Sequence, residues 1–98
     1  MKRDEVLKKL KEAEAVLRKQ GVKHAALFGS VARGDDRPDS DIDIVVALDP
    51  KIVVTVFDYV GVKDFICEMF GSSVDVVSLE GLKPLMRPRV TADAIYAF

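Results

Sequence analysis

The most informative stretch of the chain reads GSVARGD at residues 29–35 and continues as DIDI at residues 41–44. The segment before it, Val22–Phe28, is short, apolar and bounded by glycines, which predicts a strand. The segment containing its second half, Asp41–Leu48, is rich in β-branched residues and predicts another strand. Residues 34–40 between them have the composition of a loop throughout. The stretch therefore joins two strands through a short helical turn and a loop.

Outward from these strands, helical and extended segments alternate along the chain. Apolar side chains recur at helical spacing in residues 3–20, which predicts an amphipathic helix ending at Gly21. Residues 52–70 predict a second helix, although the β-branched start of this segment also favours a strand. The other expected elements are a strand at residues 73–79, two short helical pieces within residues 82–92, and a final strand or packed terminus at residues 94–98. This alternation predicts one α/β layer structure.

The composition limits the classes of protein to which the chain can belong. Its 98 residues, 49% hydrophobic and 32% charged, predict a single globular domain spanning residues 1–98. A net charge of −1 gives no support to direct nucleic-acid binding. The single cysteine, Cys67, excludes an internal disulfide, and no apolar run approaches the ~18 residues of a membrane span. We expect a cytoplasmic protein whose small size leaves part of a substrate site to a partner or a second copy.

Two carboxylates lie close together in the second predicted strand. Because side chains alternate along a strand, Asp41 and Asp43 point to one side, while Ile42 and Ile44 point to the other. Neighbouring carboxylates repel each other, and a divalent cation such as Mg²⁺ relieves that repulsion. The pattern alone is also compatible with a solvated strand end.

The turn before the loop has features suited to phosphate binding. Gly29 allows a ligand to approach the backbone closely, and the Ser30 hydroxyl and the N–H groups that follow can donate to phosphate oxygens. Arg33 lies one turn further on, within reach of a phosphate. A tight turn with a helix cap would account for the same residues.

A third acid, Asp75, interrupts the apolar strand at residues 73–79. It is either a carboxylate at a strand edge or the third member of a set with Asp41 and Asp43. Three acids on adjacent strands suit a centre that holds two metal ions.

Taken together, GSVARGD, DIDI and Asp75 resemble the fingerprint of the DNA polymerase β-type nucleotidyltransferases. The chain is most similar to the minimal nucleotidyltransferase (MNT) proteins of bacteria and archaea, and the resemblance covers essentially all of it. It implies an α+β nucleotidyltransferase fold with a small mixed sheet of three to four strands flanked by helices.

The resemblance also implies a reaction, the transfer of a nucleoside monophosphate from a nucleoside triphosphate to a hydroxyl. Asp41, Asp43 and Asp75 would hold two Mg²⁺ ions and would be the catalytic residues. Gly29 and Ser30 would bind the triphosphate of ATP, with help from Arg33.

Proteins of this group resemble antitoxins that adenylylate and so inactivate a HEPN ribonuclease toxin. The implied partner is therefore a HEPN-type toxin, and the implied assembly is a homo- or hetero-oligomer. Two alternatives remain open at this stage. One is a non-catalytic module that inhibits its partner by docking. The other is a small-molecule nucleotidyltransferase of the aminoglycoside-modifying type.

Overall fold

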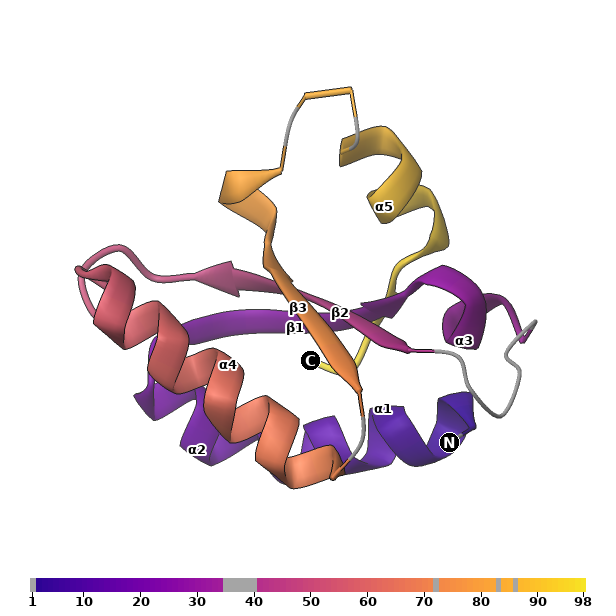
Figure 1. The fold of residues 1–98 in the computed structure, drawn as a ribbon, viewed down its shortest axis with the longest axis horizontal. Helices are drawn as coiled ribbons and strands as arrows, with labels where there is room; N and C mark the ends of the chain where they lie inside the picture. The colour runs from indigo at the N-terminus through magenta and orange to yellow at the C-terminus, as the bar shows by residue number, and fades with distance from the viewer. Residues whose placement is uncertain (1, 35–40, 72, 83, 86) are drawn as a thin grey trace.

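A mixed β-sheet organises the chain (Figure 1). The computed structural model describes residues 2–34, 41–71, 73–82, 84–85 and 87–98, so most of the predicted loop at residues 34–40 lies outside the described residues. Over the described residues, the four strands are β1 (Val22–Phe28), β2 (Ile42–Leu48), β3 (Val74–Ser78) and β4 (Ile95–Tyr96), in the order β3-β2-β1-β4. β1 is antiparallel to β2 and β4, whereas β2 and β3 are parallel. The mixed four-stranded sheet predicted from the resemblance is confirmed.

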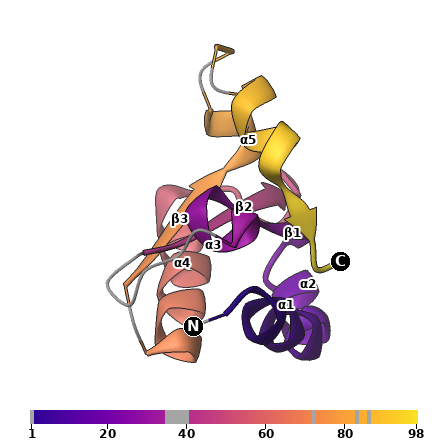
Figure 2. The same cartoon turned by 90° about the vertical axis from the view of Figure 1, so that its right-hand side faces the viewer.

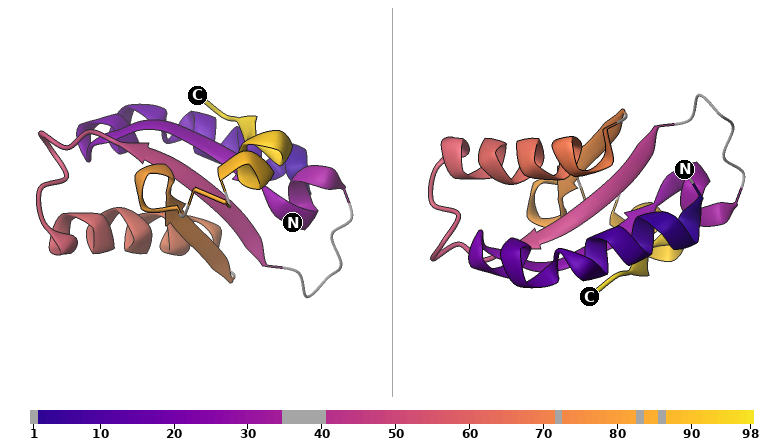
Figure 3. Two further views of the ribbon diagram at one scale, coloured as in Figure 1. Left: turned by 90° about the horizontal axis from the view of Figure 1, so that it is seen from above. Right: turned by 90° about the horizontal axis from the view of Figure 1, so that it is seen from below.

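Helices are distributed unequally between the two faces of the sheet (Figures 1 and 2). The lower face in Figure 1 is covered by α1 (Arg3–Glu12), α2 (Glu14–Lys19) and α4 (Val56–Phe70). The upper face has α5 (Arg87–Asp93) and the short 3-10 helix η1 (Leu79–Gly81). Seen from above in Figure 3, β1 and β2 extend well beyond the part of the sheet that α5 covers.

The hydrophobic core follows the same division. Beneath the sheet, a large cluster includes Leu10 of α1, Leu27 of β1, Ile44 of β2 and Ile66 of α4, all fully buried. Among the described residues, a second cluster above the sheet has three buried members, Ala26, Val45 and Val90, with partly buried side chains around them. Burial of apolar area is the dominant stabilising term in folding, so the lower face provides most of the stability of the domain.

The helix predicted at residues 3–20 is two helices, which meet at Ala13. The N–H of Ala13 donates to both Lys9 O and Leu10 O, at 3.1 and 3.2 Å, a shared hydrogen bond typical of helix ends. The prediction of helical structure is therefore correct, and the prediction of one continuous helix is wrong.

The helix predicted at residues 52–70 begins at Val56. Thr55 and Asp58 form a capping box, in which each side chain accepts from the backbone N–H of the other residue. Before it, Ile52 and Val53 donate their N–H groups to Asp49 O in a turn. The β-branched start of the segment therefore lies outside the helix and forms neither a helix nor a strand.

In the C-terminal region, two helical pieces were expected within residues 82–92. The structure has α5 there, while the other short helix, η1, ends before this range. Pro88 lies in the first turn of α5, where a missing N–H leaves no helical hydrogen bond unmade. The expected final strand forms as β4, whose two residues pair with β1. Over the described residues, no helix is long and apolar enough to cross a membrane.

Candidate active site

Asp43 and Asp75 are cross-strand neighbours near the start of β2 and of the edge strand β3. The register of the parallel strands β2 and β3 places Asp43 directly opposite Asp75. Along these strands Asp43 alternates with Ile44, which is in the lower core, and Asp75 alternates with Val76, which is there too. Both carboxylates therefore project from the upper face. Asp41 immediately precedes β2, so the structure brings all three predicted acids to one end of the sheet.

The turn from β1 into α3 (Gly29–Arg33) passes directly beside Asp43. Phe28 is the register partner of Asp43, and Gly29 follows it with a positive φ of 77°. A Cβ atom added to Gly29 would overlap Asp43 Oδ2 and lie 3.1 Å from Asp43 Cγ. Glycine is required here for two reasons, because of its backbone conformation and because the carboxylate occupies the space of a side chain. The fold thereby packs the first residue of the GSVARGD stretch against an acid of the DIDI stretch.

The electrostatic environment of Asp43 reflects this crowding. Burial raises the pKa of its carboxyl above the usual range, and the negative charges of Asp75 and Asp41 raise it further. The positive charge of Arg33 opposes the rise in this pKa. Asp43 is partly buried, whereas Asp41 and Asp75 are exposed. The charges of Asp41 and Asp75 near the partly buried carboxyl of Asp43 make a region where a cation would be stabilised.

The donor chemistry of this region fits a hard divalent cation such as Mg²⁺, which favours carboxylate oxygens and retains several waters. The acids are neighbours but do not form a closed ligand set: in the part of the chain that the structure describes, no three acidic, His or Cys side chains converge on one point. The fit therefore rests on Asp43 facing Asp75, on Asp41 beside them, and on the repulsion that raises the pKa of Asp43.

Arg33, the last residue of α3, forms an ion pair with α5. Its Nη1 donates to Asp93 Oδ2 at 2.8 Å, across 60 positions of sequence. Ser30 is partly buried in the first turn of α3. The structure thus keeps Gly29, Ser30 and Arg33 on one short helix beside the acids, and it adds a partner for Arg33 that sequence reasoning missed.

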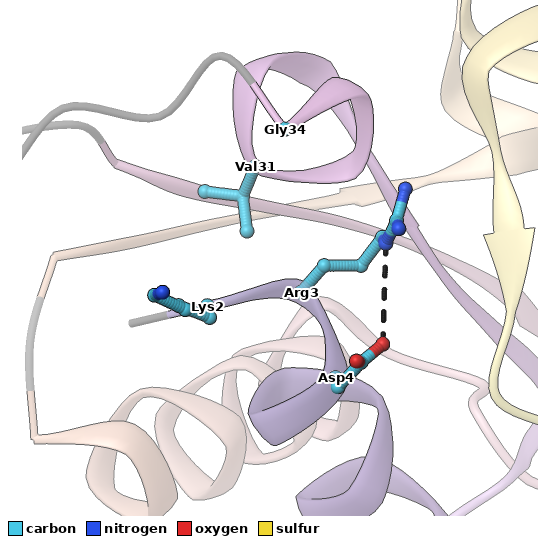
Figure 4. Close-up of a pocket in the computed structure, with 5 residues that line it drawn as sticks. All are labelled: Lys2, Arg3, Asp4, Val31 and Gly34. Carbon is cyan, nitrogen blue, oxygen red and sulfur yellow. Dashed lines mark ion pairs between the residues drawn. The ribbon is translucent and has the colours of Figure 1, made fainter.

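A hollow of about 240 Å³ lies on the side of α3 that faces the start of α1 (Figure 4). It is lined by Lys2, Arg3, Asp4, Val31 and Gly34, and so contains none of the three acids. Arg3 Nη1 donates to Ala32 O at 3.2 Å, near the C-terminal end of α3, where a positive charge is favourable. We interpret this contact as structural, because it links α1 to α3, the helix that contains Gly29 and Ser30.

Tyr59 of α4 is a second residue whose position the sequence did not indicate. Its hydroxyl donates to Val76 O at 3.0 Å, on the edge strand β3. Burial raises the pKa of this phenol, and the charge of Asp75 raises it further. The sequence analysis missed this contact because nothing in the local pattern distinguishes Tyr59 from a packing residue.

Comparisons with known proteins show the family to which the chain belongs. The model of the nucleotidyltransferase domain family matches residues 5–97. A protein of Methanocaldococcus jannaschii, provisionally named a protein adenylyltransferase, is 36% identical over 80 residues, which are 82% of this chain and 84% of that protein. The chain belongs to the nucleotidyltransferase domain family, and it is a nucleotidyltransferase.

Solved structures give the same fold. A provisionally assigned minimal nucleotidyltransferase superimposes with a TM-score of 0.81 at 33% identity, covering 97% of this chain and 95% of that one. A chain in the complex of a tri-AMPylated Shewanella oneidensis HEPN toxin with an MNT antitoxin superimposes with a TM-score of 0.64 at 19% identity. That match covers 94% of this chain and 71% of the other, and it supports the fold alone.

Proposed function

We propose that this nucleotidyltransferase transfers AMP from ATP to a hydroxyl group of a partner protein and releases pyrophosphate. The observation that carries the proposal is the register of β2 and β3, which sets Asp43 opposite Asp75, with Gly29 packed against Asp43. In nucleotidyl transfer, catalysis consists mainly of positioning and charge stabilisation, and an arrangement of this kind can provide both.

Each predicted residue has a distinct task in this proposal. Gly29 brings the backbone of α3 close to the triphosphate, and the Ser30 hydroxyl donates to a phosphate oxygen. Asp41, Asp43 and Asp75 would hold the divalent metal ions. Bound there, the ions would neutralise phosphate charge and lower the pKa of the acceptor hydroxyl. Asp75, an exposed acid on the edge strand β3, would accept the proton of the acceptor hydroxyl.

A protein acceptor is supported by the names of similar proteins. The M. jannaschii relative is provisionally named a protein adenylyltransferase, and the Shewanella oneidensis complex contains an AMPylated toxin together with an MNT antitoxin. Over the described residues, no second domain covers the upper face of the sheet (Figure 2). We propose that the partner is a HEPN-type toxin, that its modified hydroxyl belongs to a side chain such as tyrosine, and that this chain is its antitoxin.

The test uses the full chain, ATP labelled in the α-phosphate, Mg²⁺, and a HEPN-type protein as the candidate partner. We expect label on the partner with the wild-type chain and none with Asp41→Ala/Asp43→Ala. A matched control, Asp64→Ala/Glu68→Ala, removes two exposed carboxylates from α4 and should label the partner as the wild type does.

The same assay separates this proposal from its alternatives. If the double variant at Asp41 and Asp43 still inhibits the partner fully, docking is the operative mechanism and the enzymatic account is wrong. If label passes to an aminoglycoside and never to the partner, the acceptor is a small molecule.

A further inference from the structure

We propose that Asp93 is a positioning residue, which holds the guanidinium of Arg33 in place for the phosphates of the bound nucleotide. The inference rests on the proposed function, since it takes α3 as the element that contacts the triphosphate. It goes beyond that proposal because it gives α5, which contains none of the predicted site residues, a part in nucleotide binding.

The geometry that carries the inference is an ion pair between two helix ends. Arg33 is the last residue of α3 and Asp93 is the last residue of α5. Arg33 Nη1 lies 2.8 Å from Asp93 Oδ2, a short charge-assisted hydrogen bond. Figures 1 and 2 show α5 above the sheet on the side of α3, and the ion pair joins these two helices.

The same helix lies beside the acids. Gly29, at the other end of α3, is packed against Asp43, so a guanidinium held at the last residue of this five-residue helix stays near the predicted triphosphate site. A guanidinium has five N–H donors in a fixed plane, so it can bridge a carboxylate and a phosphate at once.

A purely structural role explains this pair less well. The side chains of Arg33 and Asp93 are 48% and 36% exposed, and ion pairs at such positions contribute little to stability. Val90, one turn earlier in α5, is buried in the upper core and already anchors the helix to the sheet. What the ion pair adds is the orientation of a long, flexible side chain, and holding such a group in place saves the entropy of ordering it on binding.

The test measures nucleotide affinity without relying on transfer, by isothermal titration calorimetry of AMP-PNP and Mg²⁺ into the full chain. Loss of a charged hydrogen-bond partner predicts that Arg33→Ala raises Kd about tenfold or more, and that Asp93→Asn raises it about threefold to fivefold. Asp93→Glu keeps the charge and should restore most of the affinity. In steady-state transfer, Asp93→Asn should raise the KM for ATP and leave kcat within about twofold, because Asp93 does not touch the reacting atoms.

Two comparisons make the test specific. In an Arg33→Ala background, Asp93→Asn should change Kd no further, because its effect passes through Arg33. Glu14→Gln removes the acid of another 2.8 Å ion pair, with Arg18 in α2, and should leave Kd unchanged.

Wild-type Kd in Asp93→Asn, or an equal additional loss in the Arg33→Ala background, would overturn the inference. Nucleotide binding that depends on Asp93 without any label on the partner would leave the inference standing and remove the proposed transfer reaction.

Discussion

The lower and upper faces of the sheet are built from the same strands, yet they differ in what they bury. The lower face packs against three helices and contains fully buried side chains from α1, β1, β2 and α4. The upper face has a small core around Val45 and Val90, and at one end it presents Asp43 and Asp75. Alternation along a strand lets one backbone serve both faces, since each acid has an apolar neighbour on the opposite side.

The difference separates stability from chemistry. Burial and nearby negative charge raise the pKa of Asp43, so its ionised form is less favourable in the folded protein than in the unfolded chain. A fold can include such an unfavourable group only if other parts of it compensate. Here the strands that display the acids are held by the lower core, and substitutions on the two faces should therefore produce different kinds of defect.

The largest effect is expected from removing the central carboxylate on the upper face. Asp43→Asn should reduce AMP transfer about 10³-fold or more, because metal ions and their ligands contribute several kcal/mol to transition-state stabilisation. Its free energy of unfolding should be unchanged or higher near neutral pH, since the repulsion by Asp75 and Asp41 disappears. Rates with labelled ATP and urea unfolding of the same preparation would check both expectations. A large loss of stability in this variant would show that the two faces are not separable.

The next effect compares the two cores directly. Ile66→Ala, at a fully buried position of α4, should lower the free energy of unfolding by about 2–5 kcal/mol. Val90→Ala, in the smaller upper core, removes less apolar area and should cost roughly 1–2 kcal/mol. Urea unfolding of both variants measures the difference, and equal losses would contradict the division of stability proposed for the two faces.

A third prediction concerns Gly29, where the backbone meets the acids. Gly29→Ala should destabilise the fold by about 1–2 kcal/mol, since alanine is strained at a φ of 77°. It should also reduce transfer at least about tenfold, because the new methyl displaces the Asp43 carboxylate and small misplacements are costly in catalysis.

Gly71→Ala is the matched control for this variant. Gly71 also has a positive φ, of 62°, but a Cβ atom there would meet nothing within 4 Å. It should lose comparable stability and no activity. Equal activity in the two alanine variants would show that contact between Gly29 and Asp43 does not matter for transfer.

The local parts of this arrangement could be predicted from the sequence. Strand alternation predicted that Asp43 and Ile44 point to opposite faces, and the acid inside the apolar strand at residues 73–79 left open a set in which Asp75 joins Asp41 and Asp43. The register confirms that they are neighbours. Their roles in metal binding, and those of Gly29 and Ser30 in binding phosphates, stay predictions.

The parts that could not be predicted depend on contacts between distant segments. Arg33 and Asp93 are 60 positions apart, and no local periodicity links the end of one short helix to the end of another. The start of α4 was missed for a different reason. The capping box of Thr55 and Asp58 is visible in the sequence, but the apolar run before it gave a stronger signal of continued secondary structure.

The smallest effect is expected from a substitution in this capping box, which tests the lower face of the sheet alone. Asp58 accepts hydrogen bonds from the N–H groups of Thr55 and Val54, at 3.1 and 3.0 Å, and these bonds lower the pKa of its carboxyl below the ordinary value of 3.8. Because the folded-state pKa is depressed, the ionised group stabilises the fold above the unfolded pKa, and that contribution is lost as the pH falls through the folded value. Asp58→Asn keeps an acceptor oxygen and removes the charge.

The stability difference between wild type and Asp58→Asn should therefore be fully present near neutral pH and should disappear in acid below the folded pKa. Thermal unfolding across this pH range would measure the stability difference. Transfer by Asp58→Asn is expected at the wild-type rate, because α4 covers the lower face of the sheet. A difference that persists unchanged in acid would mean that hydrogen-bond geometry, and not charge, is what Asp58 contributes. A loss of transfer at neutral pH would connect the lower face to the chemistry of the upper one.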